Sequence, residues 1–200
     1  HDLGYSSPVV WGDQVWLTTA TRKGEVLYAV CIDLNSGRII HDVEVFTPAK
    51  PQRIHRNNSY ATPSPVIEEG LVYVHYGTHG TACLNTKTGE VMWRRDDLNC
   101  EHMQGPVSSP VLHEDLLIVP LEGVDVQLVV ALDKKTGKTL WANTEIEHSA
   151  AYCSGVVVTH GGVRQLLTMT QRSVVGVDVK TGALVWSASY LPRSPQNALT

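Results

Sequence analysis

The side chains best suited to chemistry lie in short polar stretches between apolar segments. Cys100 and His102 stand two residues apart, and thiols and imidazoles are ligands that zinc and copper accept. His79 could supply a third ligand. The C-x-H spacing has no second C-x-x-C pair to support it, so we assign no metal site.

Amide, imidazole, carboxylate and guanidinium groups in these stretches can donate and accept hydrogen bonds in many geometries. The predicted ligand-binding residues are Asn57, Asn58, Ser59, His79, His102, Gln104, Asp125, His148 and Arg172. The alternative for residues 57–59 is that their side chains close the loop on its own backbone. The sequence has no nucleophile elbow and no phosphate-binding loop, so it assigns no catalytic residue.

Strands and tight turns must position these residues. In residues 131–141, ALDKKTGKTLW, an apolar strand ends at Asp133, whose carboxylate can accept bonds from the N–H groups of the turn. Gly137 can take the positive φ that the reversal requires. Trp141 then begins the next strand with a large apolar surface and one N–H group to satisfy.

The pattern occurs four times. CLNTKTGEVMW at 83–93 and GVDVKTGALVW at 176–186 repeat it, and CIDLNSGRIIH at 31–41 is a degenerate copy in which His41 takes the place of the tryptophan as a packing substitution. The turn glycines lie roughly 45 to 52 residues apart, a period typical of propeller blades with four short strands each. We expect blades at about 6–45, 63–97, 107–144 and 153–190 in one domain spanning 1–200.

The form A-x-D-x-x-T-G-x-x-x-W resembles the tryptophan-docking motif of the PQQ-like repeat, found in quinoprotein-type β-propellers. The resemblance covers essentially the whole chain. It implies an all-β propeller of four-stranded antiparallel blades, in which Trp93, Trp141 and Trp186 are structural docking residues. The family usually closes with seven or eight blades. The four blades here therefore predict part of a larger ring, a half that associates with another copy, or a four-bladed ring.

A four-stranded meander places its alternate turns at opposite ends. The turns between strands 1 and 2 and between strands 3 and 4 are short and stereotyped. The loops between strands 2 and 3 and the connections between blades are longer, and they hold all the predicted ligand-binding residues. Variable polar loops on a rigid scaffold are where function usually lies, so we expect a partner to bind at that end.

Composition excludes several classes of protein. The net charge of −4, from 16 basic and 20 acidic residues, argues against nucleic acid as the main partner, since phosphate binding needs a basic stripe. No apolar run approaches the roughly 18 residues of a membrane-spanning helix. The chain begins at His1 close to a strand signal, so we expect it to be an excised or processed piece. Cys31 and Cys83 occupy the same repeat position, which places them too far apart for a disulfide.

The family resemblance leaves two functions open, because the family contains both quinone-dependent dehydrogenases and non-enzymatic propellers. The first is a non-catalytic module that binds a protein, peptide or glycan and needs no cofactor. The alternative is a quinoprotein dehydrogenase, or a fragment of one, that holds PQQ with calcium. Members of the second class typically carry an adjacent Cys-Cys pair, whereas the four cysteines here are isolated. The resemblance also implies a bacterial periplasmic or extracellular location.

Overall fold

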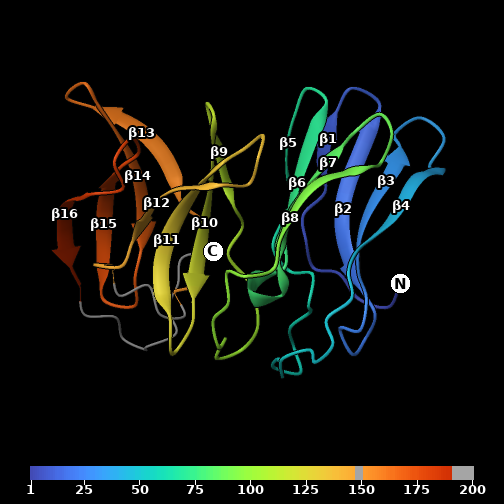
Figure 1. Ribbon diagram of the computed structural model, residues 1–200, viewed down its shortest axis with the longest axis horizontal. Helices are drawn as coiled ribbons and strands as arrows, with labels where there is room; N and C mark the ends of the chain where they lie inside the picture. The colour runs from blue at the N-terminus through green and yellow to red at the C-terminus, as the bar shows by residue number, and fades with distance from the viewer. Residues whose placement is uncertain (147–150, 191–200) are drawn as a thin grey trace. The chain divides into compact units, whose positions relative to one another are not determined.

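The computed structural model describes residues 1–146 and 151–190. These residues form four four-stranded antiparallel sheets, and their only helix is the 3-10 turn η1 (Gly77–His79) (Figure 1). The prediction of an all-β chain with four four-stranded blades is confirmed. The chain divides into two compact units, each containing two sheets: residues 1–99 with 104–107, and residues 100–103 with 108 onward.

Each sheet of the first unit is a simple meander, with strands paired in sequence order. The first sheet contains β1 (Val9–Trp11), β2 (Gln14–Ala20), β3 (Leu27–Asp33) and β4 (Ile39–Phe46). The second contains β5 (Val66–Glu68), β6 (Leu71–His75), β7 (Thr81–Asn85) and β8 (Val91–Arg95).

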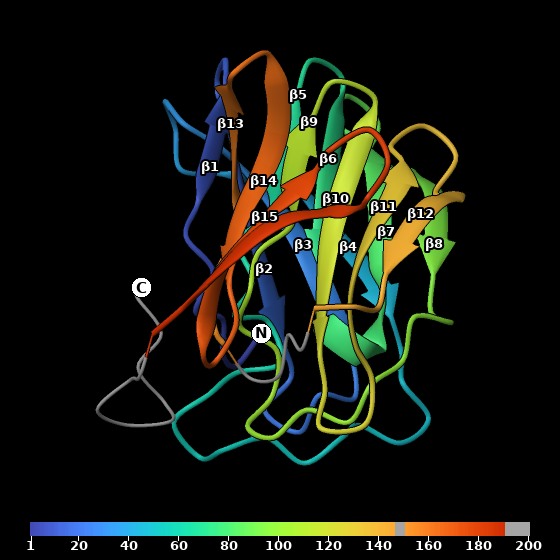
Figure 2. The same ribbon diagram turned by 90° about the vertical axis from the view of Figure 1, so that its left-hand side faces the viewer.

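The second unit repeats this topology. Its third sheet contains β9 (Val111–His113), β10 (Leu116–Glu122), β11 (Gln127–Asp133) and β12 (Thr139–Asn143). Its fourth sheet contains β13 (Val156–His160), β14 (Val163–Met169), β15 (Ser173–Asp178) and β16 (Leu184–Ser189). Figure 2 looks onto this fourth sheet.

The turn before each outermost strand forms for a local reason. Asp133 Oδ1 accepts hydrogen bonds from the N–H of Lys135 at 3.1 Å and of Thr136 at 2.8 Å, and from the Thr136 hydroxyl at 2.7 Å. These bonds, the Thr136 hydroxyl first, lower the pKa of the Asp133 carboxyl. Gly137 completes the turn at φ 70°, a conformation that glycine adopts without steric cost. Asp33, Asn85 and Asp178 make the corresponding bonds in the other sheets.

A β-bulge occurs at one repeat position in all four sheets. In the third sheet Ala131 pairs with Trp141 and Leu132 pairs with Thr139, so Leu140 has no residue opposite it. The equivalent extra residues are Ile40, Met92 and Val185. All four have exposed side chains, and each precedes the tryptophan or histidine of the repeat. The bulge therefore turns the extra residue toward solvent, and in the first and third sheets the ring that follows it, His41 or Trp141, covers the turn glycine of the next sheet.

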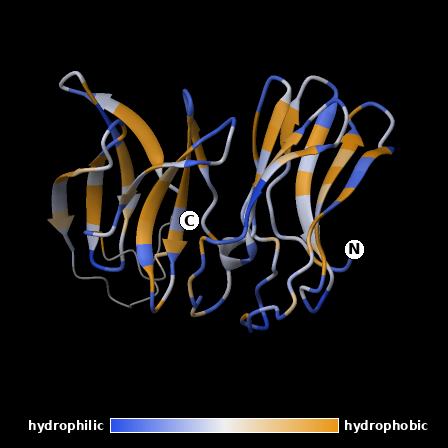
Figure 3. Ribbon diagram, in the orientation of Figure 1, coloured by the Kyte–Doolittle hydropathy of each residue, from blue (hydrophilic) through white to orange (hydrophobic). Residues whose placement is uncertain are grey.

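The core of each unit lies between its two sheets. In the first unit Trp16, Ala29 and Cys31 of the first sheet pack with Val72 and Leu84 of the second. In the second unit the core joins residues of the third sheet (Ile118, Val129, Ala131) to residues of the fourth (Leu166, Val175, Val177). Figure 3 shows this pattern, with hydrophobic residues along the strands and hydrophilic residues at the turns.

Candidate functional site

The predicted binding end of the first unit is built around Asn58. Its Nδ2 donates to the carbonyl oxygens of Gln104 at 2.9 Å and Pro106 at 3.3 Å. Its Oδ1 accepts from the N–H of Ser59 at 2.8 Å and from the Thr62 hydroxyl at 2.6 Å. Asn58 therefore joins the long connection between the first two sheets to residues 104–106. Its hydrogen-bonding groups are used to hold loops.

The other predicted residues near Asn58 differ in whether their side chains are buried in the loop or exposed to solvent. Ser59 is buried, and its hydroxyl accepts from the N–H of Ala61 at 3.0 Å and donates to the Leu3 carbonyl at 3.3 Å. Asn57 is exposed. Gln104 contributes its backbone carbonyl, which accepts from the His55 N–H at 3.0 Å and from Asn58. Of these predicted residues, Asn57 is the one whose side chain lies open to solvent.

His79 lies on η1 at the edge of a cavity of about 400 Å³ in the first unit. Its Nε2 accepts from the Gln52 N–H at 3.4 Å, and its ring lies 5.7 Å from that of Tyr60. The side-chain amide of Asn99 is oriented so that its oxygen and its nitrogen both have suitable hydrogen-bond partners. In this orientation the nitrogen donates to the carbonyl of Asp96 at 3.2 Å and to the carbonyl of Thr78 at 3.0 Å. The exposed residues Lys50, Arg94 and Asp96 complete the rim.

The chemistry of this cavity favours an acidic or hydroxyl-rich ligand. The rim carries two permanent cations, Lys50 and Arg94, and one carboxylate, Asp96. A guanidinium group can bind a carboxylate through two parallel hydrogen bonds. The residues predicted from the sequence include His79 but neither Lys50 nor Arg94.

In the second unit Cys100 and His102 do form a pair. The Cys100 Sγ lies 3.6 Å from Nε2 and 3.9 Å from Nδ1 of His102. Burial raises the pKa of Cys100 to about 12, and Asp125 and Glu122 add to that shift. Burial also lowers the pKa of His102, although the same two carboxylates oppose this. Both groups are therefore neutral near pH 7, and a neutral thiol is a poor nucleophile and a poor metal ligand.

The predicted third ligand, His79, belongs to the other unit. Within residues 1–146 and 151–190, no group of three His, Cys, Asp or Glu side chains is arranged to hold a metal ion. Asp125 instead closes a loop, because its Oδ1 accepts from the N–H of Glu101 at 2.6 Å and of Val126 at 2.7 Å. The Glu101 bond is the largest cause of the lowered pKa of the Asp125 carboxyl.

A buried carboxylate beside this pair was not predicted. Glu122 is 5% exposed, and its Oε2 accepts from the Ser108 hydroxyl at 2.6 Å. Glu122 ends an apolar strand, and Ser108 lies in the S-S-P sequence that opens the third sheet. Neither position looks unusual in the sequence, since only the fold brings residues 108 and 122 together.

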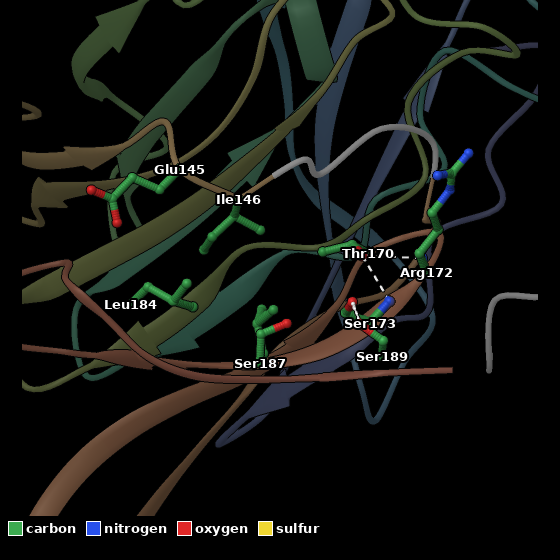
Figure 4. Close-up of a pocket in the computed structure, with 9 residues that line it drawn as sticks. Glu145, Ile146, Thr170, Arg172, Ser173, Leu184, Ser187 and Ser189 are labelled. Atoms are coloured by element: carbon green, nitrogen blue, oxygen red, sulfur yellow. Dashed lines mark hydrogen bonds between the residues drawn. The ribbon is translucent and has the colours of Figure 1, made fainter. Parts of the chain in front are cut away.

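Arg172 lies at one end of a pocket of about 310 Å³ in the second unit, and Figure 4 shows Glu145 at the other end. Thr170 shapes the loop, because its hydroxyl accepts from the N–H groups of Arg172 at 3.1 Å and Ser173 at 3.0 Å. The Arg172 side chain is exposed, and the hydroxyls of Ser173 and Ser189 lie 3.3 Å apart in the same pocket. His148, the remaining predicted ligand-binding residue, lies outside the described residues.

The tryptophans of the repeat have different surroundings. Trp141 Nε1 donates to the Val179 carbonyl of the fourth sheet at 2.9 Å, and a methyl group on Gly182 would lie 2.5 Å from its ring. His41 takes the same place over Gly89 of the second sheet and stacks on Trp16 at 5.7 Å. Trp93 lies 6.3 Å from Tyr73. Trp186 is exposed, and its Nε1 donates at 2.7 Å to Gln165 of its own sheet.

Solved structures with this arrangement of sheets are quinoprotein-type propellers. A quinohemoprotein alcohol dehydrogenase from Comamonas testosteroni superposes with a TM-score of 0.64 at 16% identity, over 94% of this chain and 35% of that one. BamB from Moraxella catarrhalis superposes with a TM-score of 0.54 at 13% identity, over 92% of this chain and 61% of that one. At these identities the likeness establishes the fold: the chain is a PQQ-like repeat propeller of four blades.

The family follows from the sequence. The family model described as outer membrane protein assembly factor BamB matches residues 7–199. The chain belongs to that family. An uncharacterized protein of Rickettsia prowazekii is 23% identical over 147 residues, which are 72% of this chain and 33% of that protein. The chain thus spans about a third of the length of this curated relative.

Proposed function

We propose that this chain is a non-catalytic binding module that holds a protein, peptide or glycan partner at the loop ends of its sheets. The observation that carries the proposal is the difference between the two ends of each sheet. The turn ends repeat one Asx-type turn four times, whereas the loop ends differ from one another and hold the polar cavities beside His79 and Arg172.

The chemistry of the loop ends supports binding over catalysis. The Cys100–His102 pair is neutral, and the carboxylate of Asp125 already accepts two backbone N–H bonds. These groups do not form the cluster of oxygen ligands that calcium needs beside a quinone. The residues described therefore do not fit PQQ with calcium, and we derive no reaction step through that cofactor.

The family supports a location outside the cytoplasm. Its description names outer membrane protein assembly, and this supports our proposal that the chain works in the bacterial periplasm or outside the cell. Among the described residues, no helix combines the length and apolar character needed to cross a membrane. The net charge of −4 argues for a partner other than nucleic acid. Association with a second copy is a separate possibility that concerns the sheet faces, not the loop ends.

Peptide and glycan arrays test the proposal. The double variant Lys50→Glu with Arg94→Glu reverses both cations of the cavity beside His79, and both side chains are exposed, so the fold should survive. A matched control, Lys87→Glu with Lys180→Glu, makes the same charge change in two turns at the opposite end. We expect the wild-type chain and the control to bind the same array members and the first variant to lose them. Binding that only the control loses would place the site at the turn end, and binding that both variants keep would refute the assignment of the site to the cavity beside His79.

A further inference from the structure

The long connection between β4 and β5 carries a cluster of positive charge. Residues 47–65 include Lys50, Arg53 and Arg56 but no aspartate or glutamate. The whole chain has 20 acidic residues against 16 lysines and arginines, so this loop differs in sign from the rest of the protein. Figure 1 shows the connection at the loop end of the first unit, where η1 also lies.

The three cations of this loop have no acidic partner. Lys50, Arg53 and Arg56 are exposed, and their side chains form no hydrogen bond or ion pair with any residue in 1–146 or 151–190. Arg95 shows the contrast, because Asp97 holds its guanidinium group at 2.5 and 2.8 Å. The charge of the loop is therefore not neutralised within the described part of the chain.

The backbone beneath these cations is tethered at several points. The Gln52 N–H donates to His79 Nε2 at 3.4 Å, and the Gln52 carbonyl accepts from the Tyr60 hydroxyl at 2.7 Å. The His55 N–H donates to the Gln104 carbonyl at 3.0 Å. The cations therefore lie on a loop whose path is already set, which reduces the entropy cost of binding a ligand.

Ile54 determines which side of the loop faces solvent. Its side chain packs against the hydrophobic core of the first unit, and a methyl group on the buried Gly105 would lie 2.8 Å from it. Arg53, His55 and Arg56, which lie beside it along the chain, are all exposed. The large apolar side chain of the loop thus faces inward while the basic side chains face solvent.

The cavity beside His79 adds a fourth cation. Lys50 of the loop and Arg94 of β8 both line this cavity, and Asp96 is the one carboxylate among the lining residues that the structure describes. The loop and the cavity share Lys50, so their charges form one continuous surface. We call it the cationic surface, and its members are Lys50, Arg53, Arg56 and Arg94.

The surroundings of the cationic surface favour carboxylates over the phosphates of nucleic acids or membranes. Three of its four cations are arginines, whose planar guanidinium groups bind a carboxylate through two parallel hydrogen bonds. Single-stranded nucleic acid also needs exposed aromatic rings for its bases, whereas Phe46 and Tyr60 are each 8% exposed. Binding in a membrane interface needs apolar side chains that face outward, and Ile54 faces the core.

We propose that the cationic surface binds an acidic segment of a partner polypeptide, one that carries several carboxylates in succession. This inference rests on the proposed function and names the class of its partner. One carboxylate of the segment is held at the cavity rim by Lys50 and Arg94, and neighbouring carboxylates pair with Arg53 and Arg56. Because these pairs are exposed, salt screens them and weakens the complex.

Fluorescence anisotropy with two labelled peptides tests the inference on the whole chain. One peptide carries a run of glutamates, and the other carries glutamines at the same positions. We expect the chain to bind the glutamate peptide and not the glutamine peptide, and we expect added salt to weaken that binding. Equal binding of the two peptides, or no binding of the glutamate peptide, would overturn the inference.

A pair of double variants locates the binding. Arg53→Gln with Arg56→Gln should raise the Kd for the glutamate peptide about tenfold, the order of effect expected from losing two exposed ion pairs. The matched control, Arg38→Gln with Lys87→Gln, removes two exposed cations from the turn end of the same unit and should leave the Kd nearly unchanged. An equal loss in both variants would mean that the peptide responds to net charge alone, which would overturn the inference.

Backbone amide NMR locates the contact without any substitution. The glutamate peptide should shift the amide signals of residues 52–57 and leave those of residues 34–38 in place. Shifts confined to residues 34–38 would contradict the inference. Vesicles of anionic phosphatidylglycerol serve as a second probe, and vesicles that bind residues 52–57 more tightly than the peptide does would assign the surface to a membrane instead.

The acidic partner and the binding module can fail separately. If the wild-type chain does not bind the glutamate peptide, but the variant Lys50→Glu with Arg94→Glu loses uncharged peptides or glycans from the arrays, the binding module stands and the acidic partner is wrong. If the glutamate peptide is lost only by the control Arg38→Gln with Lys87→Gln, the site lies at the turn end and both proposals are wrong.

Discussion

Replacing Trp141 tests how two neighbouring blades are held together. Its ring covers Gly182, and its Nε1 donates to the Val179 carbonyl, so Trp141→Ala removes both contacts. Truncating a buried aromatic residue to alanine costs about 3–5 kcal/mol of stability. Trp141 is half-buried, so we expect a loss of about 3 kcal/mol, near the lower end of that range.

Trp141→Phe separates the two contacts, because it keeps a ring over Gly182 and removes the N–H group. The net contribution of one hydrogen bond is about 1 kcal/mol, so the phenylalanine variant should lose roughly that much. Urea unfolding followed by far-UV circular dichroism measures both losses through the midpoint at constant slope. If alanine and phenylalanine cost the same, the ring would contribute nothing over Gly182 and the account of the junction would be wrong.

Four further results are expected. His41→Ala should cost about 1–2 kcal/mol, less than Trp141→Ala, because the ring is smaller and its buried Nε2 has no hydrogen-bond partner among the described residues; equal losses in urea would contradict this. A thiol reagent should react with Cys153 in the native chain and with all four cysteines after unfolding, since the four are free and the other three are buried. Because the folded-state pKa of Asp133 is lowered, its carboxylate stabilises the fold above its ordinary pKa of 3.8 and loses this effect as the pH falls through the lowered value. The stability gap between wild type and Asp133→Ala should therefore shrink in acid, whereas Asp133→Asn, which copies the natural Asn85, should remove this pH dependence and keep the turn. Addition of PQQ and calcium should give neither a bound chromophore nor dye reduction, and either signal would favour the dehydrogenase alternative.

The sequence predicted the features that depend on near neighbours. The Asp133 turn could be anticipated because its donors lie two and three residues away along the chain. The docking role of Trp141 followed from its fixed distance to that turn, repeated in other blades. His41 was expected to replace a tryptophan in packing, and it does cover the glycine of the next turn.

The sequence was weaker where residues far apart along the chain meet. Asn58 was predicted to bind a ligand, with loop closure as the alternative, and its bonds to the carbonyls of residues 104 and 106 depend on a contact that no local pattern shows. The Ser108–Glu122 bond is hidden for the same reason. The division into two compact units also depends on the distribution of contacts, which a regular repeat does not reveal.

The bulge beside each ring also determines how the outer strands tolerate insertions and deletions. Side chains alternate between the two faces of a strand, so the extra residue shifts that alternation by one position. Deleting Leu140 would restore a regular ladder of paired residues. It would also exchange the two faces of the sheet for the side chains on one side of the deletion, relative to those on the other side. A surface loop tolerates the loss of one residue. In this strand the same loss would either move the Trp141 ring away from Gly182 or break the 2.5 Å hydrogen bond from Asn143 Nδ2 to the Gly182 carbonyl. The length of each outer strand is therefore as constrained as its composition.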